Sequence, residues 1–307
     1  MVKIFIDGKA GTTGLRIFER LAKRKDVEII NLSEEERKDV NARKKAINSS
    51  DVTFLCLPDD AARESVSLVE NDNTVIIDTS TAHRTEQGWL YGFPEIDFKF
   101  NEKVKSAKRI AVPGCHASGF IALTKPLIDE GIIDKNALLT CTSITGYSGG
   151  GKKMIAEYES DDRDELLSYP RQYALGQSHK HLKEMSKISG LENAPCFMPI
   201  VAPFKSGMQV TIPLFKNQIN KSIEEIKNVY KKYYNSRIVF YSEDAEQGFT
   251  SAGRYSKLDS MEISVYGNDE RIILSARYDN LGKGASGAAI ECLNYVTGKD
   301  KELDLEL

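Results

Sequence analysis

One cysteine stands in a segment that favours a reactive thiol. Cys115 belongs to PGCHASG at 113–119, between a short apolar strand predicted at 109–112 and an apolar helical stretch at 118–128. The N–H groups and the positive end of a helix lower the pKa of a cysteine at its start. The resulting thiolate is what a covalent nucleophile requires. The other cysteines stand among apolar residues and are interpreted as core thiols: Cys56, Cys141, Cys196 and Cys292.

Two of the four histidines stand close together further along the chain. His179 and His181 occur in SHKH at 178–181, at the start of a predicted helix over 178–189. Imidazole exchanges protons near neutral pH, so either ring could serve as acid and base beside a thiolate. A pair of solvated histidines in a first helical turn fits the residues equally well.

A glycine-rich turn, GKAGTTG at 8–14, follows an apolar strand predicted at 3–7. Glycines in such a turn permit positive φ and let backbone N–H groups approach a pyrophosphate at the following helix start. The spacing is GxxGxxG rather than GxGxxG, but its place in the first strand–helix unit favours a dinucleotide over a plain tight turn. The predicted cofactor contacts are Gly8, Ala10, Gly11, Thr12, Thr13 and Gly14.

The second predicted strand, at 27–32, indicates which dinucleotide binds. An acidic residue at its end would bind the ribose 2′-hydroxyl of NAD, but no acid stands at the tip of this strand. Ser33 follows the strand and Arg37 stands four residues further on, and a hydroxyl with a guanidinium suits a 2′-phosphate. Ser33 and Arg37 therefore predict NADP(H). Ser33 also fits a capping box with Glu36, and the two roles are compatible.

A second glycine-rich segment, GYSGGGKK at 146–153, follows another predicted strand. Its backbone amides and paired lysines could hold an anion, or the segment could be a flexible hinge. It lacks the GxxxxGK[ST] spacing of an ATP-binding P-loop.

Composition excludes several classes of protein. The 307 residues carry a net charge of −3, so no excess positive charge favours nucleic acid or an acidic membrane. No apolar run approaches the roughly 20 residues of a membrane span, and the first residues enter a strand rather than a signal peptide. Five dispersed cysteines without a CxxC pair predict reduced thiols in the cytoplasm. No metal-ligand spacing occurs.

The order of predicted elements indicates two domains. Strands at 3–7, 27–32, 52–57, 74–78 and 109–112 alternate with helical or charged stretches, which is typical of a Rossmann-like, doubly wound parallel sheet. A helix at 15–24 would bury Leu15, Phe18, Leu21 and Ala22, and the charged run 33–45 is interpreted as a solvated helix face.

After Cys115 the pattern favours an α+β domain with a mixed, largely antiparallel sheet. Its longer strands are predicted at 137–144, 208–214, 237–241, 261–266 and 271–278, with helices at 178–189, 221–234 and 284–297. Pro126 is expected to kink or stop the helix at 118–128. The domains are expected to be 1–114 with 285–307, and 115–284.

Five segments together resemble the superfamily of aspartate-semialdehyde dehydrogenase and, within it, the N-acetyl-gamma-glutamyl-phosphate reductase family in its shorter form. They are GKAGTTG at 8–14, DTSTAHR at 78–84 with YGFPEI at 91–96, PGCHASG at 113–119, GYSGGGKK at 146–153 and DNLGKGASGAA at 279–289. Their order and spacing match over nearly the full length of the chain.

The resemblance implies reduction of an acyl phosphate to an aldehyde with NADPH, with release of inorganic phosphate through a cysteine thioester, in arginine biosynthesis. Cys115 matches the nucleophile, and Tyr173 with His179 and His181 matches the Tyr…HxH segment that supplies the acid and base. His181 is preferred and His179 stays open. Further implied cofactor contacts are Cys56, Leu57, Pro58, Ser80 and Asn280. The family is usually oligomeric, which implies a dimer or tetramer.

The chain departs from the family pattern at two places. Thr81-Ala82-His83-Arg84 replaces the common ADFR, and Lys205-Ser206-Gly207 lacks the usual arginine before glycine. The residues that contact a substrate carboxylate are therefore not assigned, and the candidates are Arg84, Lys152 and Lys205. Alternatives are a reductase of aspartyl or aminoadipyl phosphate, and a non-catalytic dinucleotide-binding redox sensor.

Overall fold

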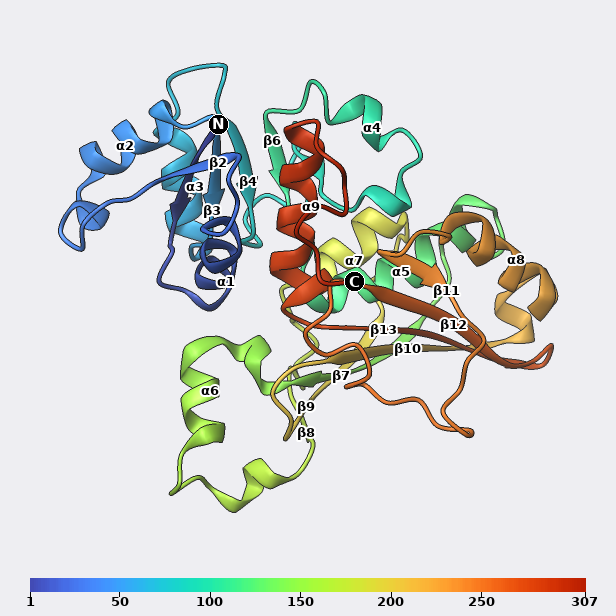
Figure 1. The fold of residues 1–307 in the computed structure, drawn as a ribbon. Coiled ribbons are helices and arrows are strands. Elements are labelled where there is room, and N and C mark those ends of the chain that lie inside the picture. The colour runs from blue at the N-terminus through green and yellow to red at the C-terminus, as the bar shows by residue number, and fades with distance from the viewer. The chain divides into compact units, whose positions relative to one another are not determined.

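The computed structural model describes residues 1–307, which form two compact units (Figure 1). Unit 1 comprises Met1–Pro113 and Ala285–Leu305, and unit 2 comprises Gly114–Gly284 and Glu306–Leu307. The chain therefore leaves unit 1 after Pro113 and returns to it through its last helix, and its final two residues belong to unit 2. None of the helices combines the length and the apolar character that crossing a membrane requires.

Unit 1 is built on six parallel strands in the order β2-β1-β3-β4-β6-β5. All five strands predicted for this part of the chain are present, and the fold class is confirmed. The two-residue β5 was not predicted because so short a segment has no recognisable pattern. The strands are β1 (Val2–Asp7), β2 (Val27–Ile30), β3 (Val52–Leu55), β4 (Val75–Asp78), β5 (Leu90–Tyr91) and β6 (Arg109–Ala111).

The strand order reverses at β1, because β2 pairs with one edge of β1 and β3 with the other. In open parallel sheets, ligands bind outside the carboxyl ends of the strands at such a switch point. The glycine-rich turn at 8–14 follows the carboxyl end of β1 directly. The topology therefore places the predicted dinucleotide loop where this kind of sheet binds ligands.

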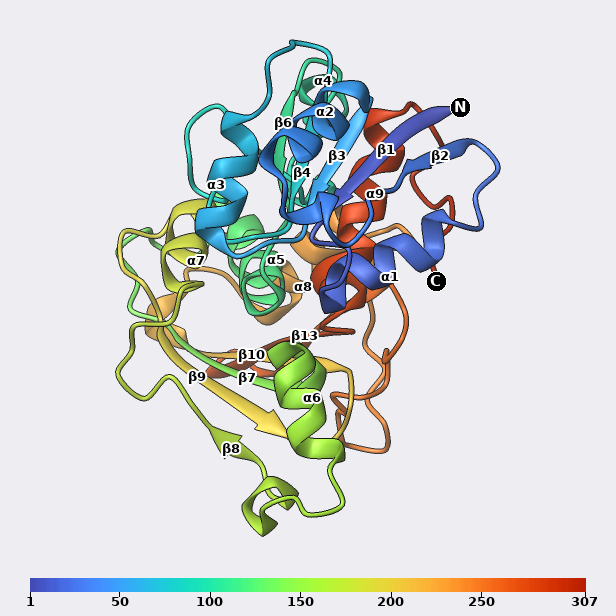
Figure 2. The same cartoon turned by 90° about the vertical axis from the view of Figure 1, so that its left-hand side faces the viewer.

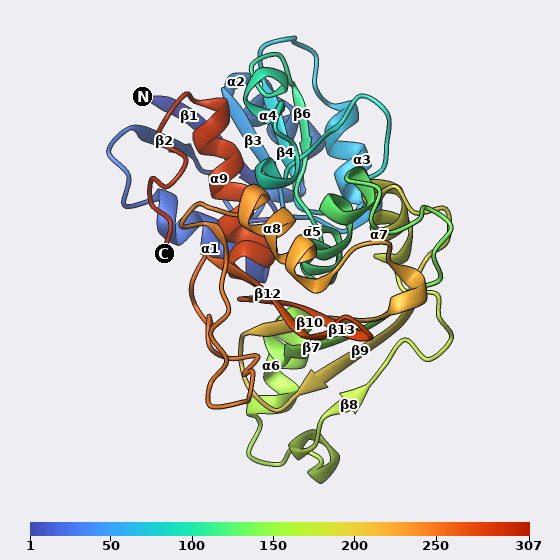
Figure 3. The ribbon, with the colours of Figure 1, turned by 90° about the vertical axis from the view of Figure 1, so that its right-hand side faces the viewer.

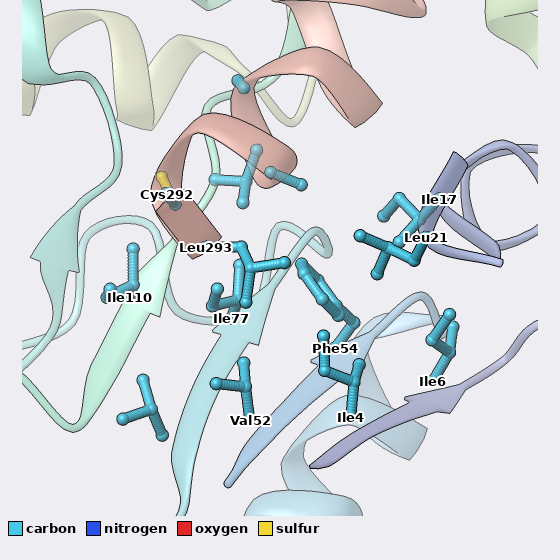
Figure 4. Packing of buried hydrophobic residues seen from close by; sticks show 14 of the residues in the cluster. Ile4, Ile6, Ile17, Leu21, Val52, Phe54, Ile77, Ile110, Cys292 and Leu293 are labelled. Atoms are coloured by element: carbon cyan, nitrogen blue, oxygen red, sulfur yellow. The ribbon is translucent and has the colours of Figure 1, made fainter. Parts of the chain in front are cut away.

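Helices cover both faces of the parallel sheet (Figure 2). The two sets of buried side chains alternate along the strands, so Ile4 and Ile6 face one layer and Phe5 faces the other. Figure 4 shows the first layer, where Phe54 meets Leu293 and Ile17. The helices are α1 (Thr12–Leu21) and α9 (Gly287–Val296) on that side, α2 (Val40–Ser49) and α3 (Asp59–Ser67) on the other, and α4 (Phe100–Lys103), with 3-10 turns η1 (Glu36–Lys38) and η2 (Pro94–Ile96).

Two predictions about unit 1 helices are wrong. The buried face of α1 is Gly14, Ile17 and Leu21, whereas Leu15 is 39% exposed, because the spacing i, i+3, i+7 selects a different stripe. The charged run 33–45 is not wholly a solvated face. Arg43 within it is buried and donates hydrogen bonds of 3.1 Å to Asp7 and 2.9 Å to Glu64.

Unit 2 contains a seven-stranded sheet in the order β11-β12-β13-β10-β7-β9-β8. The pairs β7–β9 and β11–β12 are parallel and the other four pairs are antiparallel, which confirms a mixed, largely antiparallel sheet. The strands are β7 (Thr140–Gly146), β8 (Arg171–Gln172), β9 (Cys196–Ala202), β10 (Met208–Phe215), β11 (Val239–Tyr241), β12 (Met261–Asn268) and β13 (Arg271–Tyr278).

One face of this sheet is covered by helices, with α5 packed on β10 and β13 and α8 on β12 (Figure 3). Along β7 and β10, buried residues alternate with half-buried or exposed ones, so the opposite face is only partly covered. The helices are α5 (Cys115–Asp129), α6 (Gly151–Glu159), α7 (Leu182–Ser189) and α8 (Ile223–Tyr233), with 3-10 turns η3 (Tyr147–Gly150), η4 (Glu165–Ser168) and η5 (Lys216–Gln218) and a π-turn η6 (Gly282–Ser286).

Helix α5 continues past Pro126 to Asp129, so of the two alternatives predicted there, a kink or a stop, the stop is wrong. Proline has no N–H to donate to the carbonyl four residues earlier, which belongs to Ala122. The Tyr234 hydroxyl donates to that carbonyl at 2.7 Å, and the Tyr230 hydroxyl donates to the carbonyl of Leu123. Tyr234, directly after α8, therefore supplies the hydrogen bond that proline removes.

Candidate active site

Cys115 is the first residue of α5, as the sequence predicts, and it is half-buried. Gly114 is the N-cap, with extended backbone and no capping side chain. The Gly114 N–H donates to the buried Glu184 carboxylate at 2.8 Å, which ties the turn to α7. The N–H groups of the first helical turn have no acceptor within the helix. Positive potential therefore surrounds the sulfur, and the turn can hold an oxyanion.

Two residues from the end of β13 and the loop after it lie against Cys115. The Tyr278 hydroxyl donates to the Cys115 carbonyl at 2.5 Å and accepts the Gly119 N–H at 3.0 Å. A Cβ at Gly284 would lie 3.1 Å from the Cβ of Cys115, so a larger residue there would crowd the nucleophile. Burial, and then the charge of Cys115, raises the pKa of Tyr278 well above its usual value, so this hydroxyl stays protonated.

His116 is fixed by hydrogen bonds at both ring nitrogens. Its Nδ1 lies 2.7 Å from the Ser143 hydroxyl on β7, and its Nε2 lies 2.7 Å from the Tyr173 hydroxyl. Burial, with a smaller contribution from His179, lowers the pKa of His116 to about 3. This ring is therefore neutral at ordinary pH and orients Tyr173 rather than exchanging protons.

The two predicted histidines join this cluster. The ring of His179 lies 5.7 Å from that of His116 and 4.7 Å from that of His181, and Phe197 packs 5.2 Å from His179. His181 is buried and His179 is half-buried, so they are not a solvated pair. Both precede α7, which begins at Leu182 rather than at the predicted residue 178.

The protonation of His179 follows from its surroundings. The backbone N–H of His181 donates to Nδ1 of His179 at 3.1 Å, so the neutral ring carries its proton on Nε2. Burial, and then Lys180, lowers the pKa of His179. Burial, and then the charge of Cys115, raises the pKa of Tyr173 above its usual value. Burial therefore favours the neutral forms of both Tyr173 and His179.

Gln177 holds the segment that carries Tyr173 and both histidines. Its side-chain amide donates to the Phe197 carbonyl at 2.8 Å and accepts the Phe197 N–H at 2.9 Å, as a neighbouring strand would. Gln177 and Ala174 both have positive φ, 51° and 54°, which is uncommon outside glycine. No sequence motif marks Gln177, Glu184, Ser143 or Tyr278, so the sequence does not predict their roles.

The second glycine-rich segment is a packed turn in unit 2. Gly146 lies so close to Lys205 that a Cβ would stand 2.6 Å from its carbonyl oxygen. The buried Asn280 donates to the Ser148 hydroxyl at 3.0 Å and accepts the Gly207 N–H at 3.0 Å. Asn280 therefore ties two loops of unit 2 together, and its predicted contact with the nicotinamide stays a prediction.

The predicted dinucleotide loop in unit 1 has the shape of a phosphate cradle. Gly8 has φ +86°, and a Cβ there would stand 2.3 Å from the Cys56 carbonyl oxygen. At Gly14 a Cβ would stand 2.5 Å from the carbonyl oxygen of Gly8. Gly11 is the N-cap of α1, and no side chain caps the helix. No capping side chain occupies the first-turn N–H groups, and these residues fit a dinucleotide pyrophosphate.

The remaining predicted cofactor residues lie in unit 1 around this loop. Leu57 Cδ2 would stand 3.0 Å from a Cβ at Gly8, and Pro58 precedes α3. Cys56 is half-buried, and burial raises the pKa of its thiol to about 12. Among the cysteines predicted to be core thiols, Cys141 and Cys292 are buried, whereas the prediction is wrong for Cys196, which is exposed. The Ser80 hydroxyl donates to the buried Asp78 at 2.7 Å and accepts the Ala82 N–H at 3.1 Å.

Ser33 and Arg37 follow β2 as predicted. Ser33 and Glu36 form the expected capping box, with the Ser33 N–H donating to Glu36 at 2.8 Å and the Glu36 N–H donating to the Ser33 hydroxyl at 3.2 Å. Arg37 is half-buried, and Nη2 lies 3.6 Å from the Glu34 carboxylate.

The three candidates for a substrate carboxylate differ in their surroundings. Arg84 is buried in unit 1 and donates to the backbone carbonyls of Val112 and Thr79 at 2.8 and 2.9 Å. Lys205 is exposed in unit 2 and forms an ion pair of 2.8 Å with Glu159. Lys152 is exposed near the start of α6. No group of three or more His, Cys, Asp or Glu side chains is arranged to hold a metal ion.

The chain is similar to proteins of known family. Residues 3–107 match the model for the semialdehyde dehydrogenase NAD binding domain, and residues 115–280 match the semialdehyde dehydrogenase dimerisation domain. An N-acetyl-gamma-glutamyl-phosphate reductase from Nostoc sp. is 43% identical over 99% of each chain. The reductase of the same name from Chelativorans sp. is 42% identical over 96% of this chain and 97% of its own.

Solved structures show the same fold at low identity. Aspartate semialdehyde dehydrogenase II from Vibrio cholerae superposes with a TM-score of 0.72 at 16% identity, over 97% of this chain and 98% of that one. The aspartate semialdehyde dehydrogenase from Candida albicans, solved with NADP, gives 0.69 at 17% identity, over 98% and 99%. By the full-length likeness to its sequence relatives, the chain belongs to the N-acetyl-gamma-glutamyl-phosphate reductase family.

Proposed function

We propose that this protein reduces N-acetyl-γ-glutamyl phosphate to N-acetylglutamate 5-semialdehyde with NADPH and releases inorganic phosphate. The observation that carries the proposal is the position of Cys115 at an uncapped helix start, directly before His116, whose ring contacts Tyr173 and His179. The names of the sequence relatives support the choice of substrate.

In the first step, the Cys115 thiolate attacks the acyl carbon of the acyl phosphate. His181 or His179 accepts the thiol proton. N–H groups of the first turn of α5 donate to the developing oxyanion. The carbon–oxygen bond to phosphate breaks, phosphate leaves with its electron pair, and the acyl group remains on sulfur as a thioester.

In the second step, the thioester carbonyl is reduced. NADPH, when bound, supplies the hydride. The same N–H groups hold the oxygen while the carbon becomes tetrahedral. The carbon–sulfur bond then breaks, its electron pair returns to sulfur, and the imidazolium returns its proton there. The aldehyde departs, and the phosphate released earlier takes up the one proton that the overall reaction consumes.

The two parts of the chain take different tasks in this proposal. We assign NADP(H) binding to residues 1–114 and 285–307, on the cradle at Gly8, Gly11 and Gly14 and on Ser33 and Arg37. We assign catalysis and subunit association to 115–284. The dimerisation-domain model over 115–280 supports a dimer or tetramer. Phe215 and Ile273, 58% and 44% exposed on paired strands, supply apolar surface for the contact.

Phosphate-dependent reduction of NADP⁺ tests the proposal in the oxidative direction. N-acetylglutamate semialdehyde should be oxidised at least tenfold faster than aspartate semialdehyde. Cys115→Ala should lower turnover by about 10³-fold or more and leave NADP⁺ affinity nearly intact. Cys196→Ala, which removes an exposed thiol, is the matched control and should keep full activity.

Two results would contradict the proposal. Faster oxidation of aspartate semialdehyde would assign the protein to the other acyl-phosphate reductases. Turnover by Cys115→Ala above a tenth of the unmodified rate would exclude the thioester. Absence of turnover with both semialdehydes, alongside tight NADP⁺ binding, would favour a dinucleotide-binding sensor.

A further inference from the structure

The second residue of the glycine-rich loop is a lysine with an unusual position. Lys9 Nζ donates to the Asn31 side-chain oxygen at 3.0 Å and lies 3.2 Å from the centre of the Phe18 ring. Asn31 directly follows β2, which ends at Ile30. In dinucleotide-binding sheets the residue at this strand end contacts the 2′ substituent of the ribose. The ammonium of Lys9 therefore lies between the loop expected to bind the pyrophosphate and the strand end expected to contact the ribose.

A second positive charge, that of Arg37, acts on Lys9. The charge of Arg37, after burial, lowers the pKa of Lys9, so the two positive groups repel each other. The ion pair between Glu34 and Arg37 is long, at 3.6 Å, and the Glu34 side chain is 95% exposed, so it offsets little of this repulsion. An anion with two negative charges between the cations would turn the repulsion into attraction.

The donors of Lys9 fit such an anion. An ammonium has three N–H groups, and Asn31 accepts from one of them. The other two can donate to phosphate oxygens, while the guanidinium of Arg37 offers a planar fork. The contacts with Phe18 and Asn31 also reduce the freedom of the lysine, so less entropy is lost on binding.

We propose that Lys9 is a specificity-determining residue, whose ammonium acts with Arg37 to bind the 2′-phosphate of NADP(H). The inference rests on the proposed function, because it assigns a new residue to the cofactor site of that function. The competing explanation is that Lys9 only clamps the glycine-rich loop to β2 and α1. A clamp would favour NAD⁺ and NADP⁺ equally, whereas a phosphate ligand favours NADP⁺ alone.

The test is calorimetric titration of the full-length protein with NADP⁺ and with NAD⁺, which needs no activity. Lys9→Met removes the charge and keeps an apolar stem on Phe18. It should weaken NADP⁺ binding about 10- to 100-fold, the value of a charge-assisted hydrogen bond, and change NAD⁺ binding less than twofold. Lys9→Arg should recover most of the NADP⁺ affinity.

Lys25→Met is the matched control. It makes the same change in net charge at an exposed lysine before β2, at the opposite end of that strand. Both affinities should stay within twofold of the unmodified protein. Lys9→Gln serves as a second charge-removing variant, and thermal unfolding of each variant shows that it is folded.

The outcomes separate the inference from the function on which it rests. If both charge-removing variants lose equal affinity for NADP⁺ and NAD⁺, or lose no affinity, the proposed role of Lys9 is overturned and the proposed function stands. Equal affinity of the unmodified protein for NADP⁺ and NAD⁺ would overturn the 2′-phosphate site itself. Binding of neither dinucleotide would overturn the proposed function.

Discussion

His116 should make the protein less stable in mild acid. Its pKa is about 3 in the folded protein, because the ring is buried and, to a smaller extent, because His179 is near, whereas an exposed histidine has a pKa of about 6.5. Above pH 6.5 the ring is neutral in both states and pH has no effect through it. Below pH 6.5 the unfolded chain binds a proton that the folded protein does not, so stability falls as pH falls.

The size of this effect follows from the two pKa values. Each pH unit well below 6.5 lowers the free energy of unfolding by about 1.4 kcal/mol, and the loss ends near pH 3. Between pH 7 and pH 5 the contribution of His116 is about −2 kcal/mol. The lowered pKa of His179 acts in the same direction. A comparison with a His116 variant is therefore needed to isolate the share of His116.

Urea unfolding at pH 7 and pH 5 measures the contribution of His116 to the loss of stability in acid. His116→Gln should be less stable at pH 7 by about 1–3 kcal/mol, because Ser143 and Tyr173 lose a buried partner. Between pH 7 and pH 5 its free energy of unfolding should also fall by about 2 kcal/mol less than that of the unmodified protein. The difference in stability between the two proteins therefore becomes smaller in acid. NMR titration of the four histidines gives the pKa directly.

A His116 resonance that titrates near pH 6.5 would refute this reasoning, and so would equal acid losses in the two proteins. A ring that stays neutral down to pH 5 has a consequence for the reaction. It cannot supply the proton exchange near neutral pH, although it is the histidine next to Cys115 in the chain. That task then belongs to His179 or His181.

Three further substitutions test other parts of the structure. Gly8→Ala should weaken NADP⁺ binding at least tenfold by calorimetry, because its Cβ would meet the Cys56 carbonyl at 2.3 Å and its φ is +86°; unchanged affinity would contradict the cradle. Tyr234→Phe should lower the urea-derived free energy of unfolding by about 1–3 kcal/mol, because it leaves the Ala122 carbonyl without its donor. This cost should shrink in a Pro126→Ala background, where residue 126 can donate, and an equal cost in both backgrounds would exclude the explanation. Gln177→Ala should lower kcat about tenfold or more without changing NADP⁺ affinity, because the segment carrying both histidines loses its hold on Phe197; a loss in thermal stability with unchanged kcat would show a merely structural role.

The sequence predicts the parallel sheet well because each of its strands is a short apolar run bounded by glycine, proline or charged residues. The strands of unit 2 are harder to predict. β9 was missed, although it pairs with β7 along its whole length. It contains Pro199, and a proline within an apolar run argues against a central strand. Its neighbour β8 has only two residues, so it has no periodicity to detect.

Residue chemistry predicts the nucleophile and the two histidines, but not what positions them. The hydrogen bonds of His116 reach Ser143 on β7 and Tyr173 in a distant loop, 27 and 57 residues away. Tyr278 comes from β13, 163 residues from Cys115. Such contacts depend on strand order and register, which are set by packing across the whole sheet and leave no trace in local spacing.

The way the helices begin links the two proposed sites. Asp39 caps α2 by accepting two backbone N–H groups, and Ser222 caps α8 in a capping box. Such a cap stabilises a helix by about 1 kcal/mol. By contrast, α1 and α5 begin after glycine, at Gly11 and Gly114, with no capping side chain. A capping side chain at either position would occupy the N–H groups that the proposed function assigns to a pyrophosphate and an oxyanion. An uncapped start is not confined to these two helices, because α3, α6, α7 and α9 also begin without a side-chain cap. The missing cap therefore leaves room for an anion at α1 and α5, and the residues around each helix start decide whether one binds.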